Sequence, residues 1–264
     1  RQPHDGAGGA CGRGGRVMPA DRVLVVIPTY NEAATLRKTV ERVRNAVAHA
    51  DVLIVDDNSP DGTGEIAASL AERDERVHVL HRPGKEGLGA AYVAGFSWGL
   101  ERSYDVLVEM DADGSHQPEE LDRLLARLGS ADLVLGSRYV PGGRVVNWSR
   151  WREVLSRGGN SYTRLALGIP LRDSTSGFRA FRAQTLRRID LHGVASQGYC
   201  FQVDLAWRAL RAGLTVAEVP ITFIEREHGT SKMSSEVVRE ALWRITCWGA
   251  AHRLRQLGEN VRRW

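Results

Sequence analysis

Short apolar runs alternate with amphipathic stretches over the first half of the chain. The runs are rich in Val, Ile and Leu and are bounded by turn residues, which is typical of buried strands. They occupy residues 22–27, 52–55, 77–80, 105–109 and 132–136. Between them, apolar residues recur at helical spacing. This alternation with short connections predicts an α/β fold with a doubly wound, Rossmann-like, mostly parallel sheet.

The first predicted helix follows the strand at 22–27. Leu36, Val40 and Val43 repeat at helical spacing, and Asn31 is its expected N-cap. After residue 139 the alternation loosens. The later part of the chain predicts helices at 148–167 and 201–212, a strand at 214–219, and one or two helices from 234 to the end.

Three segments follow from this pattern. Residues 1–20 are glycine-rich with few apolar side chains, so we expect a disordered tail or linker. Residues 21–233 carry the alternating pattern of one α/β domain. Residues 234–264 are amphipathic and helical, and their tryptophan and arginine content suits contact with a membrane. The alternative for this last segment is a terminal helix packed on the domain with its arginines in solvent.

Composition narrows the choice of partners. The 264 residues, 42% of them hydrophobic and 26% charged, suit one globular domain, and the net charge of +4 fits anionic substrates or an anionic membrane surface. No basic block is interleaved with aromatic residues, so nucleic acid is not expected as a partner. Three scattered cysteines without a CxxC pair indicate a reducing compartment. No apolar run approaches the ~20 residues of a membrane-spanning helix.

Two aspartates directly follow the predicted strand at 105–109. Asp111 and Asp113 therefore stand at the strand's carboxyl end, where open α/β sheets bind ligands. Such a pair can hold a divalent cation that also contacts a diphosphate and neutralises a leaving group. Alternatively, Asp113 or Ser115 only caps the helix that starts at Pro118. The local pattern leaves both interpretations open.

Acidic residues also follow the strands at 22–27 and 52–55. Because parallel strands end at the same edge of a sheet, Glu32 and Asp56–Asp57 are expected to lie near Asp111 and Asp113. Together they favour an acidic cleft for a nucleotide's base and ribose plus a metal, over a set of unrelated turns and caps. The glycines at 84, 87 and 89 match neither a phosphate-binding loop nor a dinucleotide fingerprint, and indicate a tight turn.

Cationic residues gather in loops of the later half. Arg138 follows a strand directly, and Arg226 and Lys232 lie in a polar loop, where they could close over phosphates. His116 is expected to be structural or exposed, since a lone histidine is more often so than catalytic.

Several motifs resemble those of known enzymes. Residues 28–32 (PTYNE), 56–63 (DDNSPDGT) and 111–113 (DAD) resemble the family 2 glycosyltransferases, which have the GT-A fold. Later motifs are similar to those of dolichol- or polyprenol-phosphate mannose synthases. They are residues 136–139, 156–160, 173–179, 198–202 and 229–232. The resemblance covers about residues 22–235, and makes 21–233 a GT-A catalytic domain.

The resemblance implies inverting transfer of mannose from GDP-mannose to a polyprenyl (dolichyl-type) monophosphate. It implies a cation, Mg²⁺ or Mn²⁺, on Asp111, Asp113 and Ser115, although Ser115 stands where some relatives carry Gln. Catalysis would rest on Asp111, Asp113 and Arg138. The residues implied to bind substrate are Pro28, Tyr30, Glu32, Val55, Asp57, Asp111, Ala112, Asp113, Arg138, Arg152, Arg226 and Lys232.

The resemblance also implies a place in the cell. The family often adds C-terminal transmembrane helices or small membrane subunits, and this chain resembles the single-domain type. A peripheral enzyme on the cytoplasmic face of the membrane is expected, with room for a membrane-protein partner. The alternatives are a UDP-glucose-dependent glucosyltransferase and a non-catalytic sugar-nucleotide-binding module that recruits partners to the membrane.

Overall fold

The computed structural model describes residues 21–191, 194, 199–226 and 235–261. The predicted tail at 1–20 and the candidate phosphate ligand Lys232 therefore lie outside the described residues.

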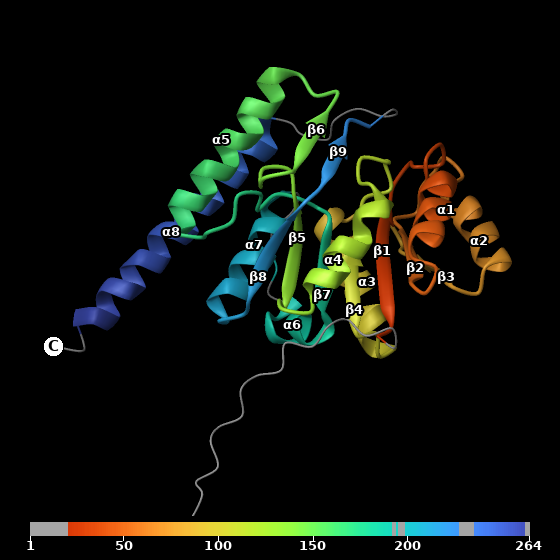
Figure 1. Ribbon diagram of the computed structural model, residues 1–264, viewed down its shortest axis with the longest axis horizontal. Helices are drawn as coiled ribbons and strands as arrows, with labels where there is room; N and C mark the ends of the chain where they lie inside the picture. Colours follow the sequence, from red (N-terminus) through yellow and green to blue (C-terminus); the bar gives the residue numbers. More distant parts are fainter. Residues whose placement is uncertain (1–20, 192–193, 195–198, 227–234, 262–264) are drawn as a thin grey trace, which may run out of the picture.

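A seven-stranded sheet forms the centre of the molecule (Figure 1). Its strand order is β3-β2-β1-β4-β7-β5-β8, and only β7 runs antiparallel to its neighbours. The strands are β1 (Val23–Thr29), β2 (Asp51–Asp56), β3 (Val77–His81), β4 (Val106–Glu109), β5 (Leu133–Ser137), β7 (Arg179–Arg182) and β8 (Val216–Pro220). The predicted mostly parallel α/β fold is confirmed.

Helices cover both faces of this sheet because its central strands are apolar on both sides. In β1, Val23, Val25 and Ile27 belong to one core, and Leu24 and Val26 belong to the other. The first core includes α1 (Leu36–Ala46), α2 (Thr63–Arg73) and α4 (Leu121–Arg127). The second includes α3 (Leu88–Glu101), α6 (Ala183–Arg188) and α7 (Tyr199–Arg211).

Two long helices lie side by side at one end of the molecule (Figure 1). They are α5 (Arg150–Leu167) and α8 (Ser235–Val261). Of the one or two helices predicted from residue 234 onwards, the structure therefore has one, over residues 235–261. Helices α5 and α8 approach closely, since a Cβ on Gly249 would lie 2.3 Å from the carbonyl oxygen of Ala166. Within the described ranges, no helix combines the length and the apolar composition needed to cross a membrane.

The structure corrects the predicted start of α1. Asn31 is not its N-cap but has a left-handed backbone with φ of 61°, and Thr35 holds the N-cap position. The reason is a contact from far along the chain: the loop after β2 fixes residues 31–33. The amides of Asn31, Glu32 and Ala33 donate to Ser59, Thr63 and Asp61, respectively.

A second, two-stranded sheet was not predicted. It pairs β6 (Arg144–Val146) with β9 (Thr222–Ile224) in parallel. Each strand has three residues, which is too short for an alternating pattern to stand out. Just before β6 and just after β9 lie chain segments that carry candidate site residues.

Helix α3 rests directly on the sheet because it lacks side chains at two positions. A Cβ on Gly95 would lie 2.4 Å from Cγ1 of Val26, and one on Gly99 would lie 2.7 Å from Cδ2 of Leu107. We expect Gly95→Val to lower the free energy of unfolding by about 1–3 kcal/mol through overpacking, measured by urea denaturation. Gly84→Val is the control, because nothing lies within 4 Å of a Cβ there. Equal stability of the two variants would contradict the close packing.

Candidate active site

The aspartate pair lies just beyond the carboxyl end of β4 and is held by four neighbouring residues. Oδ1 of Asp111 accepts a hydrogen bond from the Tyr92 hydroxyl at 3.2 Å, and its backbone amide donates to Nδ1 of His116 at 3.2 Å. Oδ1 of Asp113 accepts from the amide of Ser115 at 3.0 Å. On its other oxygen, Asp113 faces Nη1 of Arg226 at 3.5 Å. Both carboxylates are therefore fixed in place before any ligand binds.

The cap interpretation of this pair does not hold. The short 3₁₀ helix Pro118–Glu120 has Gln117 at its N-cap position, with no side-chain hydrogen bond there. Asp113 instead closes a turn onto Ser115. Its carboxylate therefore has a local structural role but retains an oxygen directed at Arg226.

Burial and neighbours give the two carboxyl groups different acidities. Burial raises the pKa of Asp111. Neighbouring groups lower that pKa, but by less than burial raises it. Burial would also raise the pKa of Asp113, but the hydrogen bond from the Ser115 amide and the nearby charge of Arg226 help to bring that pKa below its usual value. The surroundings therefore favour the ionised form of Asp113 more strongly than that of Asp111, so Asp113 is the better source of negative charge for a cation.

These residues fit a divalent cation that a substrate helps to hold. Within the described residues, no three His, Cys, Asp or Glu side chains converge as a complete cage. Mg²⁺ and similar ions are commonly held by one or two carboxylates plus substrate phosphates. The buried hydroxyl of Ser115 makes no hydrogen bond to any residue in the described ranges, so it offers a further oxygen.

His116 has the structural role expected of it. Its ring lies 5.3 Å from that of Phe178 and 5.4 Å from that of Phe223, and the residue is buried. Because Nδ1 accepts the amide of Asp111, the ring proton in this arrangement is on Nε2. His116 thus orients the aspartate loop.

The acidic residues after β2 divide into two roles. Asp56 accepts hydrogen bonds from Thr29 and Ser59 at 3.1 and 2.6 Å, and so fixes the loop. Asp57 pairs with Arg82 at 2.5 Å, and burial nonetheless raises its pKa. Sequence reasoning missed Arg82, although its position directly after β3 places it at the same edge.

The other residues predicted to contact the nucleotide differ in how accessible their side chains are. Tyr30 is half-buried, and Nζ of Lys85, another residue that was missed, lies 4.2 Å from its ring centre. Pro28 and Glu32 are half-buried as well. The side chains of Val55 and Ala112 face the two hydrophobic cores, so their contribution to a ligand would come from the backbone. The carbonyl of Ala112 already accepts the hydroxyl of Thr39 at 3.1 Å.

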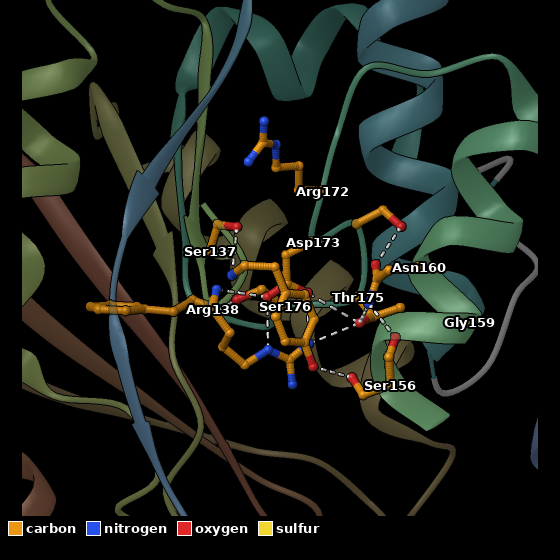
Figure 2. Close-up of polar contacts among 12 residues, drawn as sticks. Ser137, Arg138, Ser156, Gly159, Asn160, Arg172, Asp173, Thr175 and Ser176 are labelled. Carbon is orange, nitrogen blue, oxygen red and sulfur yellow. Dashed lines mark hydrogen bonds and ion pairs between the residues drawn. The ribbon is translucent and has the colours of Figure 1, made fainter. Parts of the chain in front are cut away.

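Arg138 lies in a buried polar cluster (Figure 2). Its Nε and Nη2 donate to the two carboxylate oxygens of Asp173 at 2.7 and 2.6 Å. Nη2 also donates to the hydroxyl of Thr175 at 3.0 Å. Burial opposes ionisation of Asp173, but the charge and hydrogen bonds of Arg138 lower its pKa below the usual value.

Helix α5 completes this cluster. Nδ2 of Asn160 donates to Thr175 at 3.1 Å, and the Ser174 hydroxyl donates to Oδ1 of Asn160 at 3.1 Å. The Tyr139 hydroxyl donates to the Ser156 hydroxyl at 2.6 Å. Asn160 and Asp173 belong to recognised motifs, but their pairing could not be read from the sequence, because it depends on how α5 packs.

The chain after β9 connects the aspartate pair to the cationic residues. Glu225 forms an ion pair with Arg152, and the next residue, Arg226, faces Asp113. Arg152 lies over the ring of Trp148 at 4.3 Å. The Arg138 guanidinium lies 5.4 Å from the same ring. The structure thus brings Asp111, Asp113, Arg138, Arg152 and Arg226 into one region.

Comparison with known proteins identifies relatives of this arrangement. Residues 24–190 match the family described as Glycosyl transferase family 2. An undecaprenyl-phosphate mannosyltransferase of Micrococcus luteus is 59% identical over 232 residues, which are 88% of this chain and 96% of the relative. A polyprenol monophosphomannose synthase of Mycolicibacterium smegmatis is 57% identical over 240 residues, covering 90% of this chain and 91% of the relative.

Solved structures with the same fold are more distant in sequence. Glucosyl-3-phosphoglycerate synthase of Mycobacterium tuberculosis, in complex with phosphoglyceric acid, superposes with a TM-score of 0.64 at 19% identity, covering 89% of this chain and 81% of that one. The same enzyme with Mn²⁺ and UDP-glucose gives 0.63 at 20% identity, covering 88% and 79%. At this identity the likeness shows the shared fold alone.

Proposed function

The chain belongs to glycosyl transferase family 2, and from its two mannosyltransferase relatives we infer that it is a polyprenyl-phosphate mannosyltransferase. It transfers mannose to a polyprenyl phosphate. The observation that carries this function is the fixed Asp111–Asp113 pair beside Arg226, with Arg138 and Arg152 close by. Such a site offers oxygens for a cation and guanidinium groups for phosphates, which are the two needs of phosphate-dependent sugar transfer.

For the donor, the proposal is GDP-mannose. Tyr30, Glu32 and Asp57 offer an aromatic ring and carboxylates for a base and ribose at the edge where α/β sheets bind nucleotides. The proposal assigns the diphosphate to Arg226, which faces Asp113 at 3.5 Å, and the motif resemblance gives Lys232 the same role. UDP-glucose is the second candidate donor. Competition of unlabelled GDP and UDP against labelled GDP-mannose distinguishes them, because only the cognate nucleotide should displace the label at low concentration.

The proposed cation is Mg²⁺ or Mn²⁺, held by Asp113 and Asp111 with help from Ser115. When bound, it would neutralise charge on the departing nucleoside diphosphate. Asp113 would contribute an ionised carboxylate to the cation. Tyr92 and His116 hold Asp111 in a fixed orientation beside it.

The acceptor needs little chemical activation. A phosphomonoester has a second pKa near ~6, so it is already largely anionic at pH 7 and requires no strong general base. Positioning of the phosphate is then the main requirement. The proposal assigns it to Arg152 and Arg226, whose ion pairs with Glu225 and Asp113 support this role because they keep both guanidinium groups near the aspartate pair. Arg138 is bound to Asp173, so its charge acts from a fixed position. A single displacement at the anomeric carbon would invert its configuration and give a β-linked mannosyl phosphate.

The direct test is transfer of labelled mannose from GDP-mannose to lipid. Product that partitions into organic solvent and depends on added polyprenyl phosphate is expected. Absence of lipid-linked product, together with tight GDP-mannose binding, would instead favour a non-catalytic recruitment module.

A lipid acceptor requires contact with the membrane, and we place the enzyme peripherally on the cytoplasmic face. Helices α5 and α8 lie at the same end of the molecule (Figure 1). Both expose large apolar side chains. Trp151 and Trp243 are each 70% exposed, and Leu165 and Leu254 about as much. The first half of α8 also packs on the domain, where Ile245 is buried and Trp248 stacks on Trp207.

We therefore expect the double variant Trp151→Ala/Trp243→Ala to bind vesicles at least about tenfold more weakly, since burying one such ring contributes more than about 1.5 kcal/mol. Co-sedimentation with vesicles measures the change. Leu88→Ala, an exposed apolar residue at the start of α3, is the control. Unchanged binding of the double variant would place the docking surface elsewhere.

A further inference from the structure

A small basic pocket lies beside the polar cluster of Arg138. Its volume is about 190 Å³, and it is lined by Tyr139, Arg157, Asn160, Ser161, Arg164, Leu171 and Arg172. Three guanidinium groups border it, and no carboxylate does. We call this set the arginine pocket. Three like charges around one hollow repel one another unless an anion occupies it.

Among the residues that the structure describes, two of these arginines have no neutralising contact. Neither the Arg164 nor the Arg172 side chain makes a hydrogen bond or ion pair with any residue that the structure describes; only the backbone amide of Arg172 donates, to Glu218. Arg157 pairs with Glu153 at 2.8 Å and covers the ring of Tyr139 at 4.5 Å. The pocket thus has unused donors in the planar geometry that suits a phosphate.

The arginine pocket shares Tyr139 and Asn160 with the cluster around Arg138 but lies outside the reacting region. Asp111, Asp113, Arg152 and Arg226 do not line it. Figure 2 shows the side chain of Arg172 extending away from the hydrogen bonds around Arg138. A phosphate in this pocket would therefore be additional to the one that reacts.

The position of the pocket on α5 indicates where its anion comes from. Arg157, Ser161 and Arg164 are spaced four and three residues apart, so they form one strip along the helix. Beside this strip α5 exposes Trp151, Val154, Leu155, Tyr162 and Leu165. Arginines along the border of an apolar strip reach the level of lipid headgroups when the strip enters a bilayer.

We propose that the arginine pocket binds the phosphate of an anionic phospholipid headgroup and so fixes α5 on the membrane surface. The proposal rests on the membrane association argued for the proposed function. The same phosphate chemistry is present in free inorganic phosphate and in the acceptor lipid, and the experiment separates these sources.

The test compares charge-matched variants on vesicles of phosphatidylcholine with and without phosphatidylglycerol. Arg164→Gln/Arg172→Gln should lower binding to the anionic vesicles about thirtyfold, the effect of two cations at a membrane surface. Arg164→Lys/Arg172→Lys keeps the charge but loses the planar fork, and should lower binding about threefold. Arg37→Gln/Arg73→Gln removes two exposed charges from α1 and α2, and should change binding less than about twofold.

Three results would overturn the proposal. Wild-type binding by the lysine variant would show a general attraction without a pocket. Calorimetry without vesicles measures the affinity of the wild type for inorganic phosphate. If that affinity equals its affinity for the anionic vesicles, the pocket is a site for soluble phosphate. The glutamine variant could also show an increased KM for polyprenyl phosphate in neutral micelles while its vesicle binding is unchanged. That result would assign the pocket to the acceptor lipid. Absence of mannose transfer by the wild type would refute the proposed function but leave the vesicle comparison intact.

Discussion

Asp113→Asn should lower mannose transfer by about a hundred- to a thousandfold, the usual effect of removing one preorganised electrostatic group. The amide is nearly the same size, and its oxygen can still accept the backbone hydrogen bond of Ser115. What disappears is the charge that faces Arg226 and that a divalent cation requires. The fold should therefore persist while the reaction fails.

The measurement is turnover with labelled GDP-mannose over a range of Mg²⁺ and Mn²⁺ concentrations. Asp122→Asn, at an exposed position on α4, is the matched control and should retain turnover. Thermal unfolding of both variants shows whether the fold is kept. Near-normal turnover of Asp113→Asn at saturating metal would show that Asp113 is not a metal ligand.

Asp173→Asn should destabilise the protein by about 3–5 kcal/mol, because it leaves the buried guanidinium of Arg138 without its counter-charge. The pKa of Asp173 is lowered in the folded state, so this carboxylate stabilises the protein above its unfolded pKa of about 3.8. That stabilisation is lost as the pH falls through the lower folded pKa. The difference in the free energy of unfolding between wild type and variant should therefore be largest at pH 7 and should decrease below about pH 4.

Urea denaturation at a series of pH values measures this difference. Glu153→Gln is the control, because it removes the ion pair with Arg157, which has a comparable length but joins side chains that are 34% and 51% exposed. This variant should lower the free energy of unfolding by less than about 1 kcal/mol. A pH-independent difference for Asp173→Asn would mean that its charge does not stabilise the fold.

The main strands were predictable because each is a continuous apolar run in a sheet covered on both faces. The start of α1 was not, because the amides of residues 31–33 bond to a loop nearly thirty residues away. The strands β6 and β9 escaped prediction because each has only three residues and depends on the other for its hydrogen bonds. Local pattern thus determines long elements, and contacts distant in sequence determine the short ones.

The candidate site was predictable in part for the same reason. The positions of Asp111 and Asp113 follow from β4 alone. Two neighbours that influence their charge and orientation are Tyr92, which comes from α3, and Arg226, which lies in the segment after β9. Arg138 was expected to contact phosphate, and that stays a prediction; the structure adds its partner Asp173, which is 35 residues away. This partner becomes adjacent only because β7 is inserted between β4 and β5.

Helix α5 has one side bound to the polar cluster through Asn160 and another that exposes Trp151 and Leu165. If it lies in the membrane surface as proposed, the height of the reacting atoms above the lipid is set by one helix diameter, about 10 Å. Only the first isoprene units of an acceptor could then leave the bilayer, and the rest of the chain would stay among other lipids. The turnover number should accordingly be insensitive to polyprenol length beyond those first units, so that one enzyme can serve a mixed pool of carriers.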